Sequence, residues 1–174
     1  MVYLVIELFF LSLGLFWIFA VFISNFMSAP WVPLTRSKIR RMLEIAEVKP
    51  GEVVMDLGSG DARVLTEAVK NFQARGEGIE LNPFLAWLSR LDLWIRGLRS
   101  RVIIRRGNMY ASDFSRADVI TTYLMPKAMA RLEQKIEKEA KPGARLVCYA
   151  FSLPKRPAIR IERVGAGYVY LYRF

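Results

Sequence analysis

The sequence contains no histidine and a single cysteine, Cys148, which lies in an apolar run. One cysteine cannot form a disulfide within the chain, and it cannot provide a thiolate metal site. The absence of histidine excludes the usual zinc centres and the Ser–His and Cys–His nucleophile pairs. We therefore predict no metal site, and any catalysis must use carboxylates, lysine, tyrosine or a bound cofactor.

Charge is absent from residues 8–35, and no basic residue precedes Arg36. Within this stretch the run LFFLSLGLFWIFAVFI (8–23) is almost wholly aliphatic or aromatic. Roughly 20 apolar residues in a helix cross a bilayer core, and residues 2–27 supply them. The alternatives are a cleaved signal peptide, which would carry a basic segment before a shorter apolar core, and a buried soluble helix. We predict a retained transmembrane helix.

Basic residues are confined to the rest of the chain, where all 26 Lys and Arg follow the apolar segment, beginning with TRSKIRR (35–41). The positive-inside rule then predicts a single-pass membrane protein with its C-terminal domain on the cytoplasmic side. A net charge of +10 suits an anionic membrane surface and would equally suit nucleic acid. The short chain with no presequence favours a prokaryotic cell membrane. The oligomeric state is left open.

Strand-like and helix-like segments alternate after the apolar segment, which indicates βαβ units and a parallel sheet. We predict an α/β fold, namely a Rossmann-like, doubly wound, seven-stranded and mainly parallel sheet with an antiparallel C-terminal hairpin, preceded by the transmembrane helix. The expected organisation is an anchor at 1–28, a linker at 29–34 and one α/β domain at 35–174. The predicted helices are 35–48, 61–72, 82–97 and 126–140, and the predicted strands are 52–57, 77–81, 101–106, 117–124, 145–151 and two within 158–174.

The stretch VVMDLGSGDARVL (53–65) predicts a glycine-rich turn between a strand and a helix, which is typical of nucleotide sites. A P-loop requires Gly-Lys followed by Ser or Thr, but Gly60 is followed by Asp61. A dinucleotide fold requires a third glycine where Arg63 stands, and Asp61 would lie beside the pyrophosphate. Both phosphate-binding interpretations are therefore disfavoured.

S-adenosylmethionine carries no phosphate, and its sulfonium and ammonium groups attract carboxylates. Gly58 and Gly60 would let the backbone pass against its methionine portion, where a Cβ would collide. Glu80, at the end of the second strand, has the spacing of an acid that binds ribose hydroxyls. Asn108, just past the third strand, can pair with the adenine edge. The alternatives are a purely structural turn, Glu80 as a helix cap and Asn108 as turn chemistry.

These motifs resemble the class I, seven-stranded methyltransferases. More narrowly, the chain is similar to the membrane-anchored protein-lysine methyltransferases typified by those of the adenine nucleotide translocase and the ATP synthase c-subunit, and to their archaeal soluble relatives. The resemblance covers residues 30–153 and rests on PWVP, KPGEVVMDLGSGDAR, GIELNP, RRGN, YLMP and KPGARLVCYAF.

The resemblance implies S-adenosyl-L-methionine as cofactor of a methyltransferase domain at 35–174, and it assigns residues to that cofactor. Glu80 would hold the ribose, Asn108 would meet the adenine, and Tyr123 in YLMP would orient the substrate at the methyl-transfer end. The implied cofactor-binding residues are Asp56, Gly58, Ser59, Gly60, Asp61, Glu80, Leu81, Asn108 and Met109. The chain departs from the family pattern at three places. Ala62 stands where the family has a third glycine, and Asn108 stands where it usually has Asp. The run VPLT, which ends at Thr35, stands where the family has VPT.

The expected function is membrane-anchored, in-line methyl transfer to a protein lysine. A lipid or quinone headgroup, or RNA, is the alternative substrate, and a non-catalytic cofactor-binding membrane module is the alternative from another class. Nucleic acid is disfavoured because no N/D-P-P-Y/F motif follows the fourth strand and because Cys148 lies in mid-strand, where a cytosine nucleophile would be poorly placed.

Overall fold

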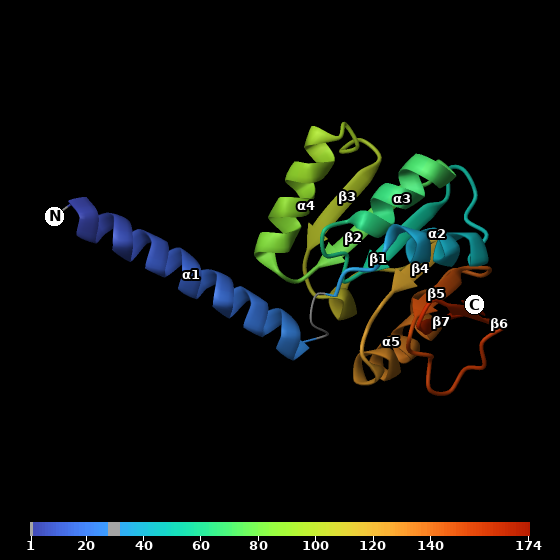
Figure 1. Cartoon of the computed structure of the whole chain (residues 1–174). Coiled ribbons are helices and arrows are strands. Elements are labelled where there is room, and N and C mark those ends of the chain that lie inside the picture. The colour runs from blue at the N-terminus through green and yellow to red at the C-terminus, as the bar shows by residue number, and fades with distance from the viewer. Residues whose placement is uncertain (1, 28–31) are drawn as a thin grey trace.

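The architecture is a long N-terminal helix followed by an α/β unit (Figure 1). The computed structural model describes the backbone of residues 2–27 and 32–174, and the side chains of 3–19 and 32–174. Helix α1 (Val2–Met27) projects away from the remainder of the molecule, and α2 (Arg36–Ile45) begins the α/β unit. The first half of the predicted linker, 29–31 of 29–34, lies outside the described residues, and the three predicted domain boundaries stay predictions.

A single seven-stranded sheet organises the described residues, in the order β3-β2-β1-β4-β5-β7-β6. The first five strands run parallel, whereas β7 pairs antiparallel with β5 and β6. The predicted mainly parallel sheet with an antiparallel C-terminal hairpin is therefore confirmed. The strands are β1 (Val53–Leu57), β2 (Arg75–Glu80), β3 (Val102–Arg106), β4 (Val119–Thr122), β5 (Arg145–Tyr149), β6 (Arg160–Val164) and β7 (Gly167–Arg173).

Helices cover both faces of the sheet, because strand side chains alternate between the two faces. Val54 packs into the cluster formed with α2, α3 (Arg63–Phe72) and α4 (Pro83–Ile95). Met55, its neighbour in β1, packs into the second cluster with α5 (Pro126–Glu139). A 3₁₀ turn, η1 (Met109–Ala111), follows β3 and has no counterpart among the predicted elements.

The strand order reverses between the neighbouring strands β1 and β4, because the chain adds β2 and β3 on one side of β1 and then returns to place β4 on the other. The carboxyl ends of β1, β4 and β2 therefore meet at one edge of the sheet. In open α/β sheets, ligands bind at this position. Helix α4 starts there because Asn82 accepts hydrogen bonds from the backbone N–H groups of Phe84 and Leu85, and Pro83 fits the first helical position.

The N-terminal helix exposes its apolar side chains throughout the part that is described, as Phe10 at 66% and Phe19 at 61% illustrate. Among the residues searched, no helix combines the length and the apolar character that a membrane span needs. The predicted transmembrane helix is not confirmed, and the side chains of its second half, 20–27, lie outside the described residues.

Candidate functional site

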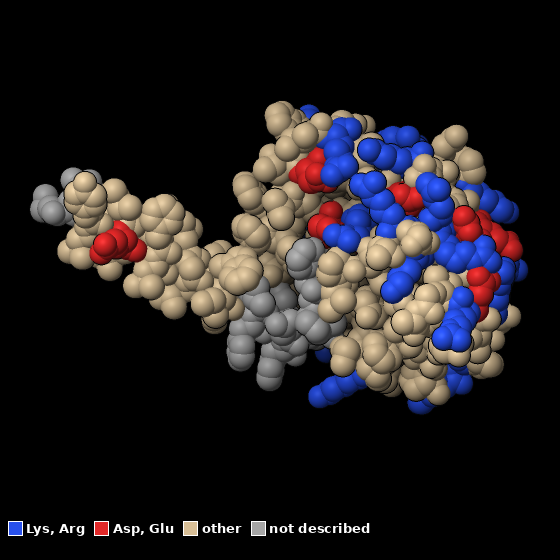
Figure 2. Space-filling view, viewed as in Figure 1, with Lys and Arg blue, Asp and Glu red and all other residues tan. Residues whose placement is uncertain are grey.

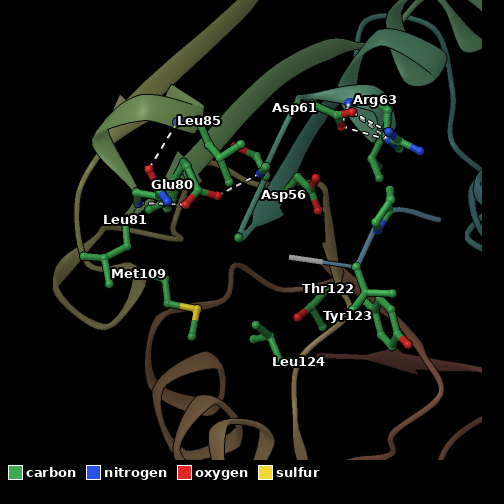
Figure 3. Close-up of a pocket in the computed structure, with 18 of the residues that line it drawn as sticks. Asp56, Asp61, Arg63, Glu80, Leu81, Leu85, Met109, Thr122, Tyr123 and Leu124 are labelled. Atoms are coloured by element: carbon green, nitrogen blue, oxygen red, sulfur yellow. Dashed lines mark hydrogen bonds and ion pairs between the residues drawn. The ribbon is translucent and has the colours of Figure 1, made fainter. Parts of the chain in front are cut away.

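A pocket of about 490 Å³ opens at the carboxyl ends of β1, β2 and β4 (Figure 3). This volume lies in the range typical of small-molecule sites. All ten residues predicted for the site line it, although the last five come from segments well separated from the glycine turn. They are Asp56, Gly58, Ser59, Gly60, Asp61, Glu80, Leu81, Asn108, Met109 and Tyr123.

The glycine turn holds its shape through backbone conformation. Gly58 and Gly60 have φ values of +80° and +52°, a region that side-chain-bearing residues rarely adopt. Within the protein, a Cβ on Gly58 would make only an ordinary contact with the Leu124 side chain, at 3.7 Å. The backbone N–H groups of Gly58 and Ser59 both donate to the Ile79 carbonyl, at 2.9 and 3.1 Å, which fixes the turn against β2.

Glu80 joins two backbone turns at the pocket wall. Its carboxylate accepts from the N–H of Gly60 and from the N–H of Asn82, each at 2.8 Å, and the residue is 6% exposed. Burial raises the pKa of Glu80, and the backbone hydrogen bonds from Asn82, Gly60 and Leu81 oppose that rise. Since Asn82 caps α4, the alternative of Glu80 as the helix cap is wrong.

Asp56 lies at the end of β1, where its carboxylate accepts a hydrogen bond of 2.7 Å from the Thr121 hydroxyl. Burial raises the pKa of Asp56 to about 7, and the negative charges of Glu80 and Asp61 add to the rise. A positively charged ligand would favour the ionised carboxylate, because an opposite charge nearby stabilises it. The pocket thus contains a buried acid that suits a cation.

Asp61 differs from the prediction in its electrostatic role. Its carboxylate forms a fork with the Arg63 guanidinium, with Nε–Oδ1 at 2.9 Å and Nη2–Oδ2 at 2.5 Å (Figure 3). The positive charge of Arg63 therefore offsets the negative charge that Asp61 presents to the pocket. Arg63 also donates to the Leu34 carbonyl at 2.9 Å and lines the pocket, a role that the sequence analysis missed.

Asn108 caps the 3₁₀ turn: its side-chain oxygen accepts from the Tyr110 N–H at 3.0 Å. The alternative of turn chemistry is therefore confirmed, and the expected adenine contact stays a prediction. The amide nitrogen stays oriented by that bond and could act as a donor to a base edge. Met109, at 6% exposed, forms apolar wall next to it.

Tyr123 follows the last residue of β4 and is half-buried at the pocket. Its ring packs edge-on against Tyr149, with centroids 5.3 Å apart and an interplanar angle of 83°. The Lys38 ammonium lies over the Tyr149 ring, 5.0 Å from the ring centroid. Aromatic faces attract cations, so this end of the pocket is suited to an amine.

Two buried hydroxyls fit a polar ligand. Ser59 and Thr122 are 4% and 1% exposed, line the pocket, and have no hydrogen-bond partner for their side-chain oxygens among the described residues. Buried polar groups normally have partners, and a ligand with hydroxyl or amine groups would supply them. Leu81, Leu85 and Leu88 provide an apolar wall for a base. The residues thus fit a small, cationic, adenosine-bearing cofactor.

Comparisons with known proteins agree with this chemistry. Residues 56–160 match the family described as the ANTKMT methyltransferase domain. The protein-lysine N-methyltransferase of Saccharolobus islandicus is 36% identical over 149 residues, covering 82% of this chain and 92% of that protein. The ATP synthase c-subunit lysine N-methyltransferase of Xenopus laevis is 32% identical, covering 82% and 62%. The adenine nucleotide translocase lysine N-methyltransferase of Mus musculus is 30% identical, covering 84% and 63%.

The chain therefore spans less than two thirds of the length of these two vertebrate relatives. Among solved structures, an RNA methyltransferase from Salinibacter ruber in complex with S-adenosyl-L-homocysteine is similar with a TM-score of 0.80 and 32% identity, covering 82% of this chain and 93% of that one. The resemblance expected from the sequence motifs is confirmed. The chain belongs to the ANTKMT methyltransferase domain family and is an S-adenosyl-L-methionine-dependent methyltransferase.

Proposed function

We propose that this enzyme methylates the ε-amine of a lysine in a protein substrate. The observation that carries the substrate class is the similarity to the archaeal protein-lysine N-methyltransferase, which extends over 92% of that protein. The Tyr123 ring, which lines the pocket, supports it independently, because the face of an aromatic ring attracts an alkylammonium group.

The residues of the pocket have distinct roles in this proposal. Glu80 would hold the ribose hydroxyls, Asp56 the ammonium of the amino-acid end, and the Asn108 amide the adenine edge. Bound S-adenosyl-L-methionine supplies an electrophilic methyl group on a sulfonium. Ser59 and Thr122, the two buried hydroxyls, would complete the polar contacts.

Alignment supplies most of the rate enhancement, up to about 7–11 kcal/mol for well-oriented reactants. Tyr123 would align the incoming amine with its ring and hydroxyl. The amine must lose a proton before it attacks. Partial burial beside aromatic rings favours the neutral amine, and a water molecule held by Tyr123 could carry the proton outward.

We also propose that α1 anchors the enzyme at a membrane, with the catalytic domain on the cytoplasmic side of a prokaryotic cell membrane. The support is the exposure of its apolar side chains and the confinement of all Lys and Arg to the chain beyond it. Figure 2 displays this division: basic side chains spread over the α/β unit, whereas α1 carries almost no charge.

RNA is the second candidate substrate. The Salinibacter ruber relative is named an RNA methyltransferase, and the net charge of +10 would favour a polyanion. Many of the basic side chains nevertheless form ion pairs, as Arg40 does with Glu67 and Arg63 with Asp61. We therefore rank the protein substrate first.

The test is to incubate the full chain with methyl-labelled S-adenosyl-L-methionine and a membrane extract, and to follow the label. Protein bands that yield methylated lysine on hydrolysis are the expected result, and the Glu80→Ala variant should label nothing. Label in RNA that ribonuclease releases, or label in the organic phase, would replace lysine with a nucleic acid or a lipid or quinone substrate.

A further inference from the structure

Helix α4 is packed the opposite way round from an ordinary surface helix. The side chains that it buries against the sheet are mostly small, since Ala86 and Ser89 are 0% exposed and Leu93 is 2% exposed. A helix on the surface of a globular protein normally turns its large apolar side chains inward and its polar side chains outward. In α4 most of the large apolar side chains point outward instead.

The outward side chains form a continuous band, which we name the α4 stripe. They recur at the i, i+3, i+4 and i+7 spacing that places side chains on one face of a helix, within an arc of about 120°. Three of them are aromatic, and none is charged or polar. The α4 stripe consists of Phe84, Trp87, Leu88, Leu91, Trp94 and Ile95, which are 37–69% exposed.

The chemistry surrounding the α4 stripe suits a membrane surface. Tryptophan side chains favour the membrane–water interface, and the two in the stripe are 57% and 58% exposed. Exposed arginines follow directly beyond the helix, at Arg96, which pairs with Asp92, and at Arg99. Arginine beside an apolar helix face is typical of helices that lie on anionic lipid.

The α4 stripe also continues into a second exposed apolar surface. Helix α1 contacts α4, and Trp17 of α1 lines the pocket together with Phe84 and Leu88. A soluble protein partner would have to cover both surfaces, whereas a bilayer can receive them together. This continuity favours lipid over a second copy of the chain as the occupant.

We propose that α4 lies in the headgroup region of an anionic membrane, with the α4 stripe facing the acyl chains. Because Phe84, Leu85 and Leu88 line the pocket as well, the pocket mouth would open at the level of the membrane surface. The enzyme would then receive its target amine from the interface and not from bulk solution. This inference extends the proposed anchoring, but it does not depend on methyl transfer.

The test measures lipid contact at α4 directly. In the full chain, Trp17→Phe, Trp31→Phe and Trp87→Phe leave Trp94 as the sole tryptophan. The protein is reconstituted with vesicles of phosphatidylglycerol and phosphatidylcholine, with and without phosphatidylcholine brominated near the headgroup end of its acyl chains. We expect the brominated lipid to reduce Trp94 emission at least about twofold, as for an interfacial tryptophan.

A matched control carries its tryptophan on the opposite face of the sheet, as Gln134→Trp with Trp94→Phe in the same background. Gln134 is exposed on α5, and its emission should be unchanged by the brominated lipid. Circular dichroism and retained cofactor binding check the fold of each variant.

Three results would overturn the inference. The first is equal quenching of Trp94 and of the tryptophan at position 134. The second is quenching in a sole-Trp17 variant without quenching of Trp94, which would leave α1 alone in the lipid and preserve the anchoring proposal. The third is an unquenched Trp94 combined with disulfide-linked dimers of a Leu91→Cys variant, which would identify a second copy as the occupant.

Discussion

Two buried carboxylates, Glu80 and Asp56, stand at the pocket with equal exposure and different partners. Glu80 accepts from two backbone N–H groups, which favour its ionised form, while among the described residues Asp56 accepts from the Thr121 hydroxyl alone. The two residues are equally exposed. Glu80 is held in place by backbone hydrogen bonds, whereas burial raises the pKa of Asp56 to about 7. Each can be tested by a single substitution.

Glu80→Ala should weaken S-adenosyl-L-methionine binding by about 10- to 100-fold, the equivalent of one charged hydrogen bond of about 1.5–3 kcal/mol. It also leaves the N–H groups of Gly60 and Asn82 without an acceptor. Isothermal titration calorimetry measures the affinity. Glu137→Ala, at an exposed position of α5, is the control, and equal affinity in the two variants would remove Glu80 from the site.

Asp56 should make cofactor affinity depend on pH. A cationic ligand favours the ionised carboxylate, so binding below about pH 7 must expel its proton; affinity should rise with pH up to about 7 and then level off. The Asp56→Asn variant, which keeps an acceptor for Thr121, should lose this slope. Calorimetry in two buffers of different ionisation enthalpy counts the proton, and an unchanged slope in the variant would contradict the assignment.

The stability of the ligand-free enzyme should change in the opposite direction. The folded pKa of Asp56, about 7, exceeds its ordinary value of 3.8. Its contribution to folding is then fully present below about pH 4 and is lost as pH rises towards 7, by up to about 4 kcal/mol. Urea unfolding at several pH values, with Asp56→Asn for comparison, measures this loss.

Tyr123→Phe should slow methyl transfer about tenfold or more while leaving cofactor affinity nearly unchanged. The ring still packs against Tyr149, so only the hydroxyl is lost. A single-turnover assay separates the chemical step from binding. A wild-type rate would leave Tyr123 as a packing residue at the core edge.

At the scale of single residues, the sequence predicted which side chains meet but not all of their partners. Strand ends in a parallel sheet meet at one edge, so Asp56, Glu80 and Tyr123 could be assigned to one pocket from topology alone. The pairing of Asp61 with Arg63 depends on the left-handed conformation of Ala62 between them, with φ of +60°, which no periodicity in the sequence encodes. The Asn108 cap depends likewise on a 3₁₀ turn too short to leave a pattern.

At the scale of elements, strand β2 packs closely against the glycine turn at Gly78, where there is no room for a side chain. A Cβ on Gly78 would lie 2.6 Å from the Ser59 hydroxyl oxygen and 2.6 Å from the Ile104 Cδ1. The turn therefore cannot keep its position if this glycine gains a side chain.

Gly78→Ala should lower the free energy of unfolding by about 1–3 kcal/mol, as overpacking in a core does, and should weaken cofactor binding because Ser59 must move. Gly107→Ala is the matched control for folding stability, since a Cβ there meets nothing within 4 Å. Urea unfolding measures both variants. An unchanged free energy of unfolding in Gly78→Ala would mean that the glycine turn shifts to accommodate the methyl group without loss of stability.

The helices and strands could be predicted because their signals are local. Asn82 and Pro83 at the start of α4, and the short runs of β1 and β4 that are buried on both faces, agree with the packing that the sheet imposes. The orientation of α4 could not be predicted, because a helix that is apolar on nearly every side does not reveal which face is buried. Only the sheet shows that the small side chains face inward.

At the scale of the whole molecule, the described side chains of α1 take no part in the hydrophobic core of the α/β unit. Both buried clusters begin no earlier than Leu34, and they include none of the described side chains of α1. Folding of the catalytic unit therefore should not require the N-terminal helix.

Removal of residues 1–31 should leave a folded enzyme that binds S-adenosyl-L-methionine within about threefold of the full chain, a change below about 1 kcal/mol. The shortened enzyme should lose its salt-resistant sedimentation with anionic vesicles, because only the basic surface and the α4 stripe would remain to hold it. Sedimentation at low and high salt measures this. Salt-resistant sedimentation without α1 would show that α1 is not needed for it and would leave the α4 stripe as its source.

The single thiol of the chain is sealed inside strand β5, where Cys148 is 0% exposed and burial raises its pKa well above the ordinary value. Thiols react as thiolates, so thiol-alkylating agents and mild oxidants should not modify Cys148 while the protein is folded. An enzyme built in this way is insensitive to the redox state of its compartment, and it offers a silent background in which any cysteine introduced for labelling reports on its own position alone.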